Sequence, residues 1–490
     1  MFVITRTDRA HAQSTIQIDN ANSLEYMETP TDKIRKLIGD VQLRQNDMRM
    51  TCDSAYMYID KNNVDAMGHV HIIQNDTMNI YAKRLKYYGN KRQAILNDSV
   101  KLVDPNMVIT TNQLNYNTKS HLATYLTGGT LKNDSSVLTS KHGYYYSDTK
   151  DAFFKHNVKL VNPRFILTAD TLRFNTASKI SYFLGPTHIV NDSGDVIYCE
   201  SGFYDTKSDS AFFTKHASLT QKAQKLLADS INYNANTKIG IARSNVIFTD
   251  TVEKAIVLGN YVFYNNKTKY LLATKKPVFI SILKTDSIYL ASDTMISITD
   301  TVTRYHNFYA FHQVKIYKSD MQGVCDSLSY SDKDSVFHLY YDPVLWVQSS
   351  QLKGDTILMF LKNRHMDHLR LLKNAFVINI ADSIHYNQVK GKNMTGYFKD
   401  NELYKLHVSG NGESIYFAKT DSGKDVGVNK ATCSNMMLYF KDKKVDHILF
   451  LVKPDAVLNP LGVVKPEELK LKDFEWLGNR RPKSKRDVLE

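Results

Sequence analysis

Residues 165 to 174 read Phe-Ile-Leu-Thr-Ala-Asp-Thr-Leu-Arg-Phe, and copies of this stretch decide the fold. Apolar side chains alternate with polar ones up to Ala169, which is the pattern of a strand with one buried face. The next apolar residue, Leu172, comes three positions later, so the alternation slips by one residue. Such a slip indicates a bulge or corner at which a strand turns without ending. We therefore expect one extra residue in this strand.

The stretch recurs along the chain with a regular period. Its general form is a small residue, Asp-Ser or a close variant, an aliphatic residue, any residue and an aromatic residue. Between residues 52 and 228, successive copies are separated by 30, 29, 29, 29, 30 and 29 residues. A fixed period of this kind indicates a repeat architecture. The copies begin at Cys52, Ala82, Thr111, Ser140, Ala169, Cys199, Ala228, Gly259, Ala291, Cys325, Gly354 and Ala381.

A second phrase, Gly or polar-x-Val-x-aliphatic, lies between the copies, as in Gly68-His-Val-His-Ile72. Its apolar residues are spaced by two, so this phrase also predicts a strand. Later members of the same column are Val278, Val344 and Phe376. Polar turns such as Asn175-Thr-Ala-Ser-Lys179 join the two phrases. Each repeat is therefore predicted to be a hairpin whose two strands are both folded at a corner.

Stacked hairpins of this kind give an all-β fold. We expect an elongated β-taco, or β-jellyroll solenoid, of stacked antiparallel V-bent strands, with about twelve repeats of roughly 29 residues. The two sheets would meet at the corners and enclose a trough of inward side chains. Terminal repeats are expected to differ from interior ones, because the open edge of a stack must be protected.

Composition and charge exclude several classes of protein. The 490 residues are 42% hydrophobic, which supplies a sizeable core, and no window approaches the 18 uninterrupted apolar residues of a membrane helix. The 63 lysine and arginine residues exceed the 50 acidic ones, giving a net charge of +13. This sign suits nucleic acid, but no RNA- or DNA-binding motif accompanies it, so we expect no nucleic-acid partner. A basic rim also suits phosphorylated lipid head groups.

The sequence suggests four segments. Residues 1–13 are interpreted as the remnant of an export signal, because Ala10-His-Ala12 resembles a cleavage site although no apolar core precedes it. The alternative is a cytoplasmic protein in which these residues occur by chance. Residues 14–380 form the repeat β-taco and residues 381–460 a related carboxy-terminal β module, in which a motif at Asn393 recurs at Asn435. Residues 461–490 form a basic tail, with a short helix expected at Pro466-Glu-Glu-Leu469.

No motif predicts catalysis. The four cysteines all occupy the small-residue place of the repeat, several repeats apart, so they are interpreted as small buried hydrophobic residues. His365-Met-Asp-His368 is the only His-x-x-His sequence, and a solvated turn is the favoured interpretation over a metal site. The recurrent Asp-Ser pairs are interpreted as turn chemistry. We expect no enzyme activity, no cofactor and no metal.

The inward positions carry apolar side chains, and two interpretations stay open for them. In the first, an aromatic ladder packs one repeat on the next. In the second, part of the trough is left unfilled for an elongated apolar ligand. The candidate lining residues for such a ligand are Leu85, Tyr87, Leu96, Val100, Leu102, Leu114, Tyr116, Phe154, Val158, Leu160, Leu172, Phe174, Phe183, Ile189, Phe213, Ile231 and Tyr233.

The repeated phrases at Ala228–Tyr233 and Gly68–Ile72 resemble those of the organic-solvent-tolerance (OstA)-like and LptA-like family of lipopolysaccharide-transport proteins. So do Gly391–Phe398, Gly410–Phe417 and Phe474-Glu-Trp476, and the resemblance covers residues 14 to about 482. It implies a periplasmic protein, with an outer-membrane association as a further expectation. It also implies that lipid A acyl chains of lipopolysaccharide lie in the trough and head groups outside. The partners it implies are an outer-membrane barrel or other transport-bridge proteins of related β-taco fold.

Three functions from different classes compete. The first is a non-enzymatic bridge or chaperone that carries lipopolysaccharide to the outer membrane for its assembly. The second is a structural or protein-interaction rod whose core is filled by its own side chains. The third is a β-helix carbohydrate-active protein, which would need parallel coils of about 20–25 residues and a local carboxylate cluster, and the sequence shows neither.

Overall fold

The computed structural model describes residues 14–74, 77–105, 107–133, 136–284, 286–362, 365–399, 402–420, 425–442 and 444–490. The expected export-signal remnant, residues 1–13, lies outside the described residues. The contacts between residues divide the chain into two compact units. Unit 1 comprises the residues up to 222 together with 230–236, and unit 2 comprises residues 223–229 and 237–490.

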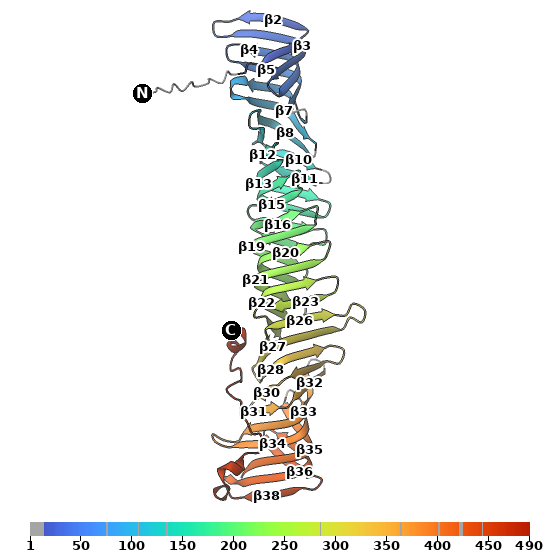
Figure 1. The fold of residues 1–490 in the computed structure, drawn as a ribbon, viewed down its shortest axis with the longest axis vertical. Coiled ribbons are helices and arrows are strands. Elements are labelled where there is room, and N and C mark those ends of the chain that lie inside the picture. Colours follow the sequence, from blue (N-terminus) through green and yellow to red (C-terminus); the bar gives the residue numbers. More distant parts are fainter. Residues whose placement is uncertain are drawn as a thin grey trace, which may run out of the picture. The chain divides into compact units, whose positions relative to one another are not determined.

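Unit 1 consists of short and long strands that follow one another along the stack (Figure 1). Its elements are β1 (Gln17–Asn20), β2 (Ser23–Glu28), β3 (Lys33–Gln45), β4 (Met48–Tyr58), β5 (Asn63–Gln74), β6 (Met78–Tyr88), η1 (Gly89–Lys91), β7 (Gln93–Asp104), β8 (Met107–Asn117), β9 (Leu122–Tyr125), β10 (Gly129–Asn133), β11 (Ser136–Ser140), β12 (His142–Tyr146), β13 (Asp151–Asn162), β14 (Phe165–Asn175), β15 (Ile180–Phe183), β16 (Thr187–Asn191), β17 (Val196–Cys199), β18 (Ser201–Asp205) and β19 (Ser210–Gln221). Strand β20 (Gln224–Asn234) has residues in both units.

Unit 2 is built in the same way. Its strands are β21 (Ile239–Asp250), β22 (Ala255–Asn265), β23 (Tyr270–Thr274), β24 (Val278–Ile282), β25 (Ser287–Ala291), β26 (Thr294–Thr299), β27 (His306–Lys318), β28 (Met321–Ser331), β29 (Val336–Tyr340), β30 (Val344–Val347), β31 (Ser350–Lys353), β32 (Thr356–Lys362), β33 (His365–Ile380), β34 (Tyr386–Lys399), β35 (Glu402–Lys419), β36 (Asp425–Lys441), β37 (Lys444–Leu451) and β38 (Asp455–Asn459). Its helical segments are η2 (Leu461–Val463), η3 (Pro466–Leu469) and α1 (Arg486–Leu489).

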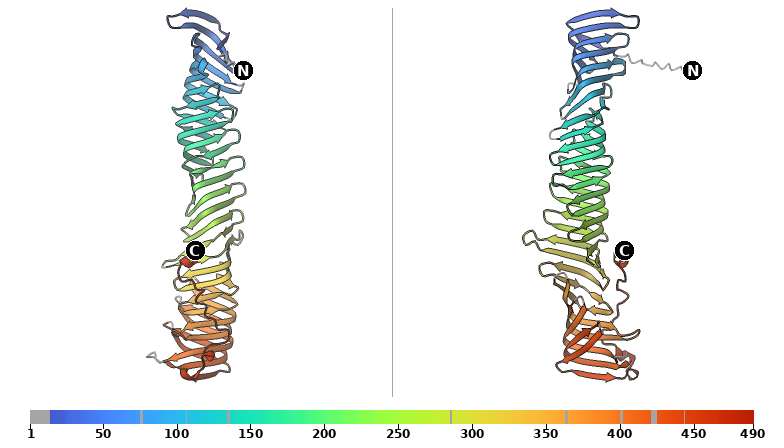
Figure 2. Two further views of the ribbon diagram at one scale, coloured as in Figure 1. Left: turned by 60° about the vertical axis from the view of Figure 1, so that its left-hand side comes forward. Right: turned by 180° about the vertical axis from the view of Figure 1, so that it is seen from behind.

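Each unit is a stack of antiparallel strands bent into two sheets, as the sequence predicted. The pairing of β14 shows the bend. Its first half, from Phe165 to Ala169, pairs with β16, and its second half, from Leu172 to Asn175, pairs with β15. One long strand therefore belongs to both sheets, which meet at its corner in a V. Figure 2 shows the strands of each unit crossing the stack one after another.

The corner lies where the alternation slips, but the extra residue lies in the other strand. Lys155 of β13 faces Thr171 and Val158 faces Ala169, so two residues, His156 and Asn157, stand opposite a single one. The expectation of an inserted residue within residues 165–174 was therefore wrong. The same register shift recurs in β3, β5, β7, β21, β27 and β33, which are the return strands of their hairpins.

Left-handed backbone makes the corner possible. His156 and Asn157 have φ of 64° and 54°, and Gly68 and His69 have φ of 73° and 39°. This conformation costs about 1–2 kcal/mol for a residue with a Cβ, and glycine and asparagine tolerate it best. The carboxylate of the facing strand stabilises it, since His69 Nδ1 lies 2.8 Å from Asp53 Oδ2. The recurrent Asp of the repeat thus contacts the corner of its neighbour.

A strap formed by residues 461–490 covers the outer face of one sheet in unit 2. Around Leu477, the buried side chains of Val344 and Trp346 form an apolar cluster with the partly buried Trp476. Nearer the start of the strap, Leu469 and Leu471 pack on a second cluster, which is formed by Ile415, Phe417 and Val428. In Figure 1 this segment runs from beside β38 to the C label near β27. The expected basic tail is therefore packed against strands.

Three buried glutamines fasten the strap. The Gln388 amide donates to the Leu469 carbonyl and accepts from the Leu471 N–H, both at 2.8 Å. Gln351 does the same to Glu475 O and Leu477 N, both at 2.7 Å. Gln322 Oε1 accepts a hydrogen bond from Arg481 Nε at 2.7 Å. A side-chain amide presents the same donor and acceptor as a peptide group. The three glutamines therefore bind the strap through hydrogen bonds of the kind that a neighbouring strand would make.

The strap changes which residues of the repeat face inward. Leu345 and Val377 are buried in the trough, whereas Val344, Trp346, Phe376 and Ile378, which continue the inward column of the sequence, point outward. The strand pairing determines which residues point inward. Leu345 is paired with Gly323, which lies on the inner face, and Trp346 is paired with Gln322, which contacts the strap on the outer face. The sequence could not separate the two faces here, since both are apolar.

Two further features differ from or refine the sequence interpretation. The copy of the repeat at Ala381 forms the hairpin turn between β33 and β34 and no corner, because Asp382 Oδ1 accepts the N–H groups of Ile384 and His385. The short helix expected at Pro466 is present as η3, Pro466–Leu469. Helix is confined to such short pieces among the described residues, and none of them has the length and apolar character needed to cross a bilayer.

Replacing Gly68 by alanine tests the corner. A Cβ at this position would lie 2.2 Å from Asp53 Oδ2, on a backbone with φ of 73°. We expect Gly68→Ala to lower the free energy of unfolding by about 1–3 kcal/mol in urea titrations. Gly128→Ala, where a Cβ meets no neighbour, controls for backbone strain alone. Equal losses in the two variants would show that the Asp53 contact is unimportant.

Truncating Leu477 tests the strap. Leu477 fills the cluster over Trp346, so Leu477→Ala should lower the free energy of unfolding by about 2–4 kcal/mol. Trp346 is fully buried, and its fluorescence should shift to longer wavelength when the cover loosens. Leu489→Ala, at an exposed strap position, is the matched control and should change stability by less than about 0.5 kcal/mol. An unchanged Trp346 emission in Leu477→Ala would contradict this role.

Candidate functional site

The candidate site is the trough between the two sheets of each unit. Alternating residues of every strand point into it, and the corner keeps both halves of a bent strand facing the same interior. The end of the trough away from the corners is its mouth. Two rows of hairpin turns border this mouth, and we name them lip A and lip B. Lip A contains the connections between β3 and β4, β7 and β8, and β10 and β11 of unit 1 and between β21 and β22 and β24 and β25 of unit 2. Lip B contains those between β8 and β9, β12 and β13, and β14 and β15 of unit 1 and between β22 and β23 and β26 and β27 of unit 2.

All the lining residues proposed from the sequence lie in unit 1 and point into its trough. Except for Tyr233, which is half-exposed, they are buried against one another. Phe183 and Phe213, for example, stack with ring centroids 6.1 Å apart. This section of the trough is therefore filled by its own side chains.

Three tyrosines of the aromatic column lie side by side in this filled section. Tyr87, Tyr116 and Tyr145 are fully buried, and burial raises the pKa of each above its usual value. The Tyr87 hydroxyl donates to Gln45 Oε1 at the opposite sheet. The Tyr116 hydroxyl has no hydrogen-bond partner among the described residues. A buried hydroxyl without a hydrogen-bond partner costs about 1–3 kcal/mol, so the Tyr116 hydroxyl lowers the stability of the packed trough.

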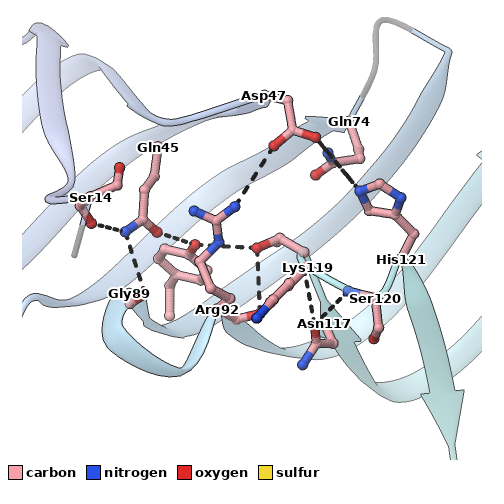
Figure 3. Close-up of polar contacts among 12 residues, drawn as sticks. Ser14, Gln45, Asp47, Gln74, Gly89, Arg92, Asn117, Lys119, Ser120 and His121 are labelled. Carbon is pink, nitrogen blue, oxygen red and sulfur yellow. Dashed lines mark hydrogen bonds and ion pairs between the residues drawn. The ribbon is translucent and has the colours of Figure 1, made fainter. Parts of the chain in front are cut away.

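Polar side chains join the two lips across the mouth of unit 1. Lys150 Nζ of lip B lies 2.8 Å from Asp104 Oδ2 of lip A, and the Asp104 side chain is buried. Lys179 Nζ donates to Asn133 Oδ1 at 3.0 Å. Nearer the amino terminus, His121 lies 3.6 Å from Asp47, and Figure 3 shows the two side chains approaching each other beside Gln74. We name these contacts the mouth clasps, and they hold this section closed.

The first strands of unit 2 form a different section of the trough. The inward residues nearest the corner, Ala242 and Val246, are buried. Those nearer the mouth, Phe248, Val257 and Leu271, are partly exposed, and the Tyr264 side chain is 37% exposed. Apolar inner surface is therefore open to solvent between β21 and β24.

A change in the mouth accompanies this opening. Lys269 occupies the same place in its lip B turn as Lys150 and Lys179 do in theirs, with φ of 50°. Its ammonium group, however, bonds to Asn266 within its own turn. At the inner edge of lip A, the first hairpins of unit 1 have the buried Met48, Met78 and Met107, and Met48 pairs with Gln74. In the first hairpin of unit 2 the smaller Ala255 stands in the place of Met48 and pairs with Ser281. Less side-chain volume thus fills the mouth.

The open section ends where the sheets meet again. Phe279 and Phe308 come from opposite sheets of unit 2, and their ring centroids lie 5.8 Å apart. Beyond them Leu328, Leu339 and Ile357 are buried in a closed interior. The candidate site is therefore a stretch of partly exposed apolar inner surface bordered by polar turns, and an elongated apolar group can bind such a surface by burying it.

The remaining chemistry-bearing residues are dispersed. The four cysteines are buried free thiols, as the sequence interpretation required. Burial raises the pKa of Cys52 to about 11 and those of Cys199 and Cys325 to about 12. Thiols of this kind are poor nucleophiles at neutral pH. His365 and His368, expected on a turn, lie instead in strand β33, where His368 stacks on Phe360 at 4.1 Å.

The residues of the open section were missed at the sequence level. Phe248, Val257 and Tyr264 belong to the same inward columns as the candidates in unit 1, so their type gives no distinction. The signal lay in their neighbours, where Ala255 and Ser281 replace the Met48 and Gln74 pair of unit 1 at the mouth. Only the volume that these neighbours leave empty separates an open recess from a packed core.

Comparisons with known proteins agree with the repeat. The family model of OstA-like proteins matches residues 13–170 and 164–229. Over residues 13–229 the chain is therefore similar to OstA-like proteins, which confirms the resemblance seen in its repeated phrases. No curated protein matches.

Solved structures give weak matches. One is LptH of Pseudomonas aeruginosa, described as the LptA-homologous periplasmic component of the lipopolysaccharide transport device. It is 19% identical, covers 22% of this chain and 80% of its own, and has a TM-score of 0.21. Another is the WD40 domain of SCAP from fission yeast, which is 10% identical, covers 89% of this chain and 96% of its own, and has a TM-score of 0.10. Neither alignment carries weight for the site.

Replacing Tyr116 by phenylalanine tests the filled section. Because the hydroxyl has no partner, we expect Tyr116→Phe to raise the free energy of unfolding by about 1–2 kcal/mol at pH 8. Tyr87→Phe, which orphans Gln45 Oε1, should lower it by a similar amount. Urea titrations of the two variants give the comparison.

The same pair should differ in pH dependence. Burial raises the pKa of Tyr116 in the folded state, so this group leaves the free energy of unfolding independent of pH below the unfolded pKa of about 10 and lowers it as the pH rises above that value. Between about pH 9 and about pH 11, on either side of the unfolded pKa of about 10, the free energy of unfolding of Tyr116→Phe should therefore fall less than that of the wild type. An equal loss would place the hydroxyl in contact with water.

Proposed function

We propose that this OstA-like chain is a periplasmic, non-enzymatic carrier that holds lipopolysaccharide on its way to the outer membrane. The observation that supports the proposal most directly is the open apolar section of the trough in unit 2. Its inner surface is partly exposed, although it faces the space between the two sheets. The exposed inner residues are Phe248, Val257, Tyr264 and Leu271. Exposed apolar surface in a recess of this kind is typical of a binding site.

Acyl chains suit the recess physically. A hydrocarbon chain gains about 0.8 kcal/mol for each methylene group that it buries, and it makes no demand for polar partners. Two bent sheets provide apolar walls on both sides of such a chain, while the mouth leaves room for a polar head. Nothing in this mode of binding requires a catalytic group.

The turns beside the recess suit an anionic head group. Lys254 and Lys284 are exposed on lip A, and Lys267 and Arg304 are exposed on lip B. Ammonium and guanidinium groups form strong charge-assisted hydrogen bonds with phosphates. In the proposed complex the phosphorylated sugars of lipid A stay outside the trough, close to these cations.

The filled section of unit 1 supports a second, structural role. Its mouth clasps and packed core give a closed body that needs no ligand for stability. In our proposal the lining residues named from the sequence, from Leu85 to Tyr233, contact lipid only when the clasps part. Until then this section acts as a rigid rod, which is the alternative that the sequence left open.

The strands at the two ends of the chain offer places for partners. Strands β1 and β2 in unit 1 both pair with β3, and strands β37 and β38 in unit 2 both pair with β36. Hydrophobic side chains stand exposed on these end strands, at Leu24 and Tyr26 in β2 and at Leu458 in β38. An edge strand of this kind can pair with the sheet of another protein. We propose that a related β-taco module or an outer-membrane barrel docks there.

Photocrosslinking tests the carrier. A photoreactive residue at Phe248 or Tyr264 should capture lipopolysaccharide in intact cells, because both side chains reach the open section. Ile247 is the matched control, since it lies next to Phe248 but points outward. A probe at Phe154, in the clasped section, should capture far less. Capture of protein neighbours alone, or equal capture from Ile247, would favour the structural rod.

A further inference from the structure

Two hairpin tips of unit 2 carry an apolar residue at the summit position where several other tips carry lysine. In many tips an Asn or Asp side chain accepts the N–H group two residues later, and that residue stands at the summit of the turn. The summit residue is lysine at Lys119, Lys207 and Lys267. In two turns of unit 2 it is valine instead. Val252 is 71% exposed and Val302 is 87% exposed.

These turns hold the valines firmly in solvent. Asp250 Oδ1 accepts the N–H groups of Val252 at 2.9 Å and Glu253 at 3.0 Å. Asp300 Oδ1 accepts those of Val302 at 2.9 Å and Thr303 at 2.7 Å. A turn fixed in this way cannot fold its summit residue back on the protein, so the cost of exposing each valine is permanent.

More apolar surface accompanies them on both lips. On lip A the next turn exposes Ile282 and Leu283, and the Ile282 N–H donates to Lys254 O at 2.8 Å, so the two turns are joined. On lip B, Tyr305 is exposed close to Val302 in the chain. Both lips thus carry apolar tips, and both border the mouth near the open section of the trough.

Positive charge surrounds these tips. Lys225, Lys254 and Lys284 are exposed on the lip A side, and Lys267 and Arg304 on lip B. Three nearby carboxylates, Asp250, Asp286 and Asp300, accept hydrogen bonds within and between the turns and have lowered pKa values, so they remain ionised beside the five cations. Glu253 is the remaining exposed acid of these turns. Apolar summits flanked by cations match the interface of an anionic membrane, where apolar side chains enter the acyl boundary and lysines remain among the phosphates.

We propose that the two lips of unit 2 are a membrane-docking surface, with Val252, Leu283 and Val302 inserting into an anionic phospholipid surface. Docking would place the mouth of the open section against the lipid–water interface, so that an acyl chain could pass between bilayer and trough with little exposure to water. The inference stands on the tips alone and does not depend on which lipid the trough holds.

Vesicle flotation tests the proposal. The full chain should float with vesicles containing phosphatidylglycerol and much less with vesicles of phosphatidylcholine, and added salt should weaken the binding. In Val252→Ser/Leu283→Ser/Val302→Ser the partition coefficient should fall by about tenfold or more, because three apolar insertions are lost. Ile384→Ser is the matched control. Ile384 occupies the same summit position and is 73% exposed, but its turn lies between β33 and β34, away from the open section.

A second measurement reports insertion itself. Val302→Trp should show a blue-shifted emission on addition of phosphatidylglycerol vesicles, after subtraction of the wild-type signal from Trp346 and Trp476. Failure of the wild type to float, flotation that does not depend on anionic lipid, or equal flotation of the triple variant would each overturn the proposal. An emission of Val302→Trp that does not shift on addition of vesicles would also overturn the proposal. Flotation that is lost once protein partners are removed would indicate a protein-docking surface instead.

The carrier function can be tested apart from docking. Photocrosslinking of detergent-dispersed lipopolysaccharide from Tyr264 should be unchanged in the triple serine variant, because the substituted tips lie outside the trough. Loss of vesicle binding with retained capture supports the docking surface. Retained vesicle binding by the triple variant overturns it, whatever the outcome of capture.

Discussion

The two-for-one corner is the constraint on which the rest of the structure depends. Two consecutive left-handed residues stand opposite one residue of the next strand, so a hairpin with this corner bends without losing its pairing, whereas other strands are divided at the bend, as between β15 and β16. Each bend costs backbone strain, which the inward side chains on both sides of it offset by packing together. Repetition of the bend, every 29 or 30 residues between residues 52 and 228, then aligns the bends and makes a trough of what would otherwise be a flat sheet.

The interior of a trough must be filled by its own side chains or occupied by a ligand, since an apolar interior open to water is unfavourable. This chain uses both solutions in different places. Unit 1 fills its interior with tyrosine, phenylalanine and methionine and joins its lips by clasps such as Asp104 to Lys150. The first strands of unit 2 carry smaller residues at the mouth and leave Tyr264 and its neighbours partly exposed. Side-chain volume at a few positions therefore separates scaffold from candidate binding site.

The strap shows how a sheet can use both of its faces. Inward residues of unit 2 fill the trough, while outward ones such as Trp346 lie under residues 461–490. Gln322, Gln351 and Gln388 bind the strap by its main chain, which allows an irregular segment to cover strands without forming one. Sequence columns became ambiguous here, because a strand that is apolar on both faces carries no alternation to read.

The sequence by itself determined the repeat, the bent hairpin and the inward columns, because period and alternation are local properties of the chain. It also located the corners of the copies from Cys52 to Gly354 to within a residue or two, although not the strand that holds the extra residue: His156 and Asn157 differ from ordinary polar residues only in their φ. Tertiary structure alone decided which section of trough is filled, where the last 30 residues lie and which tips face solvent. Each of these depends on contacts between residues far apart in the chain, and no local pattern records them.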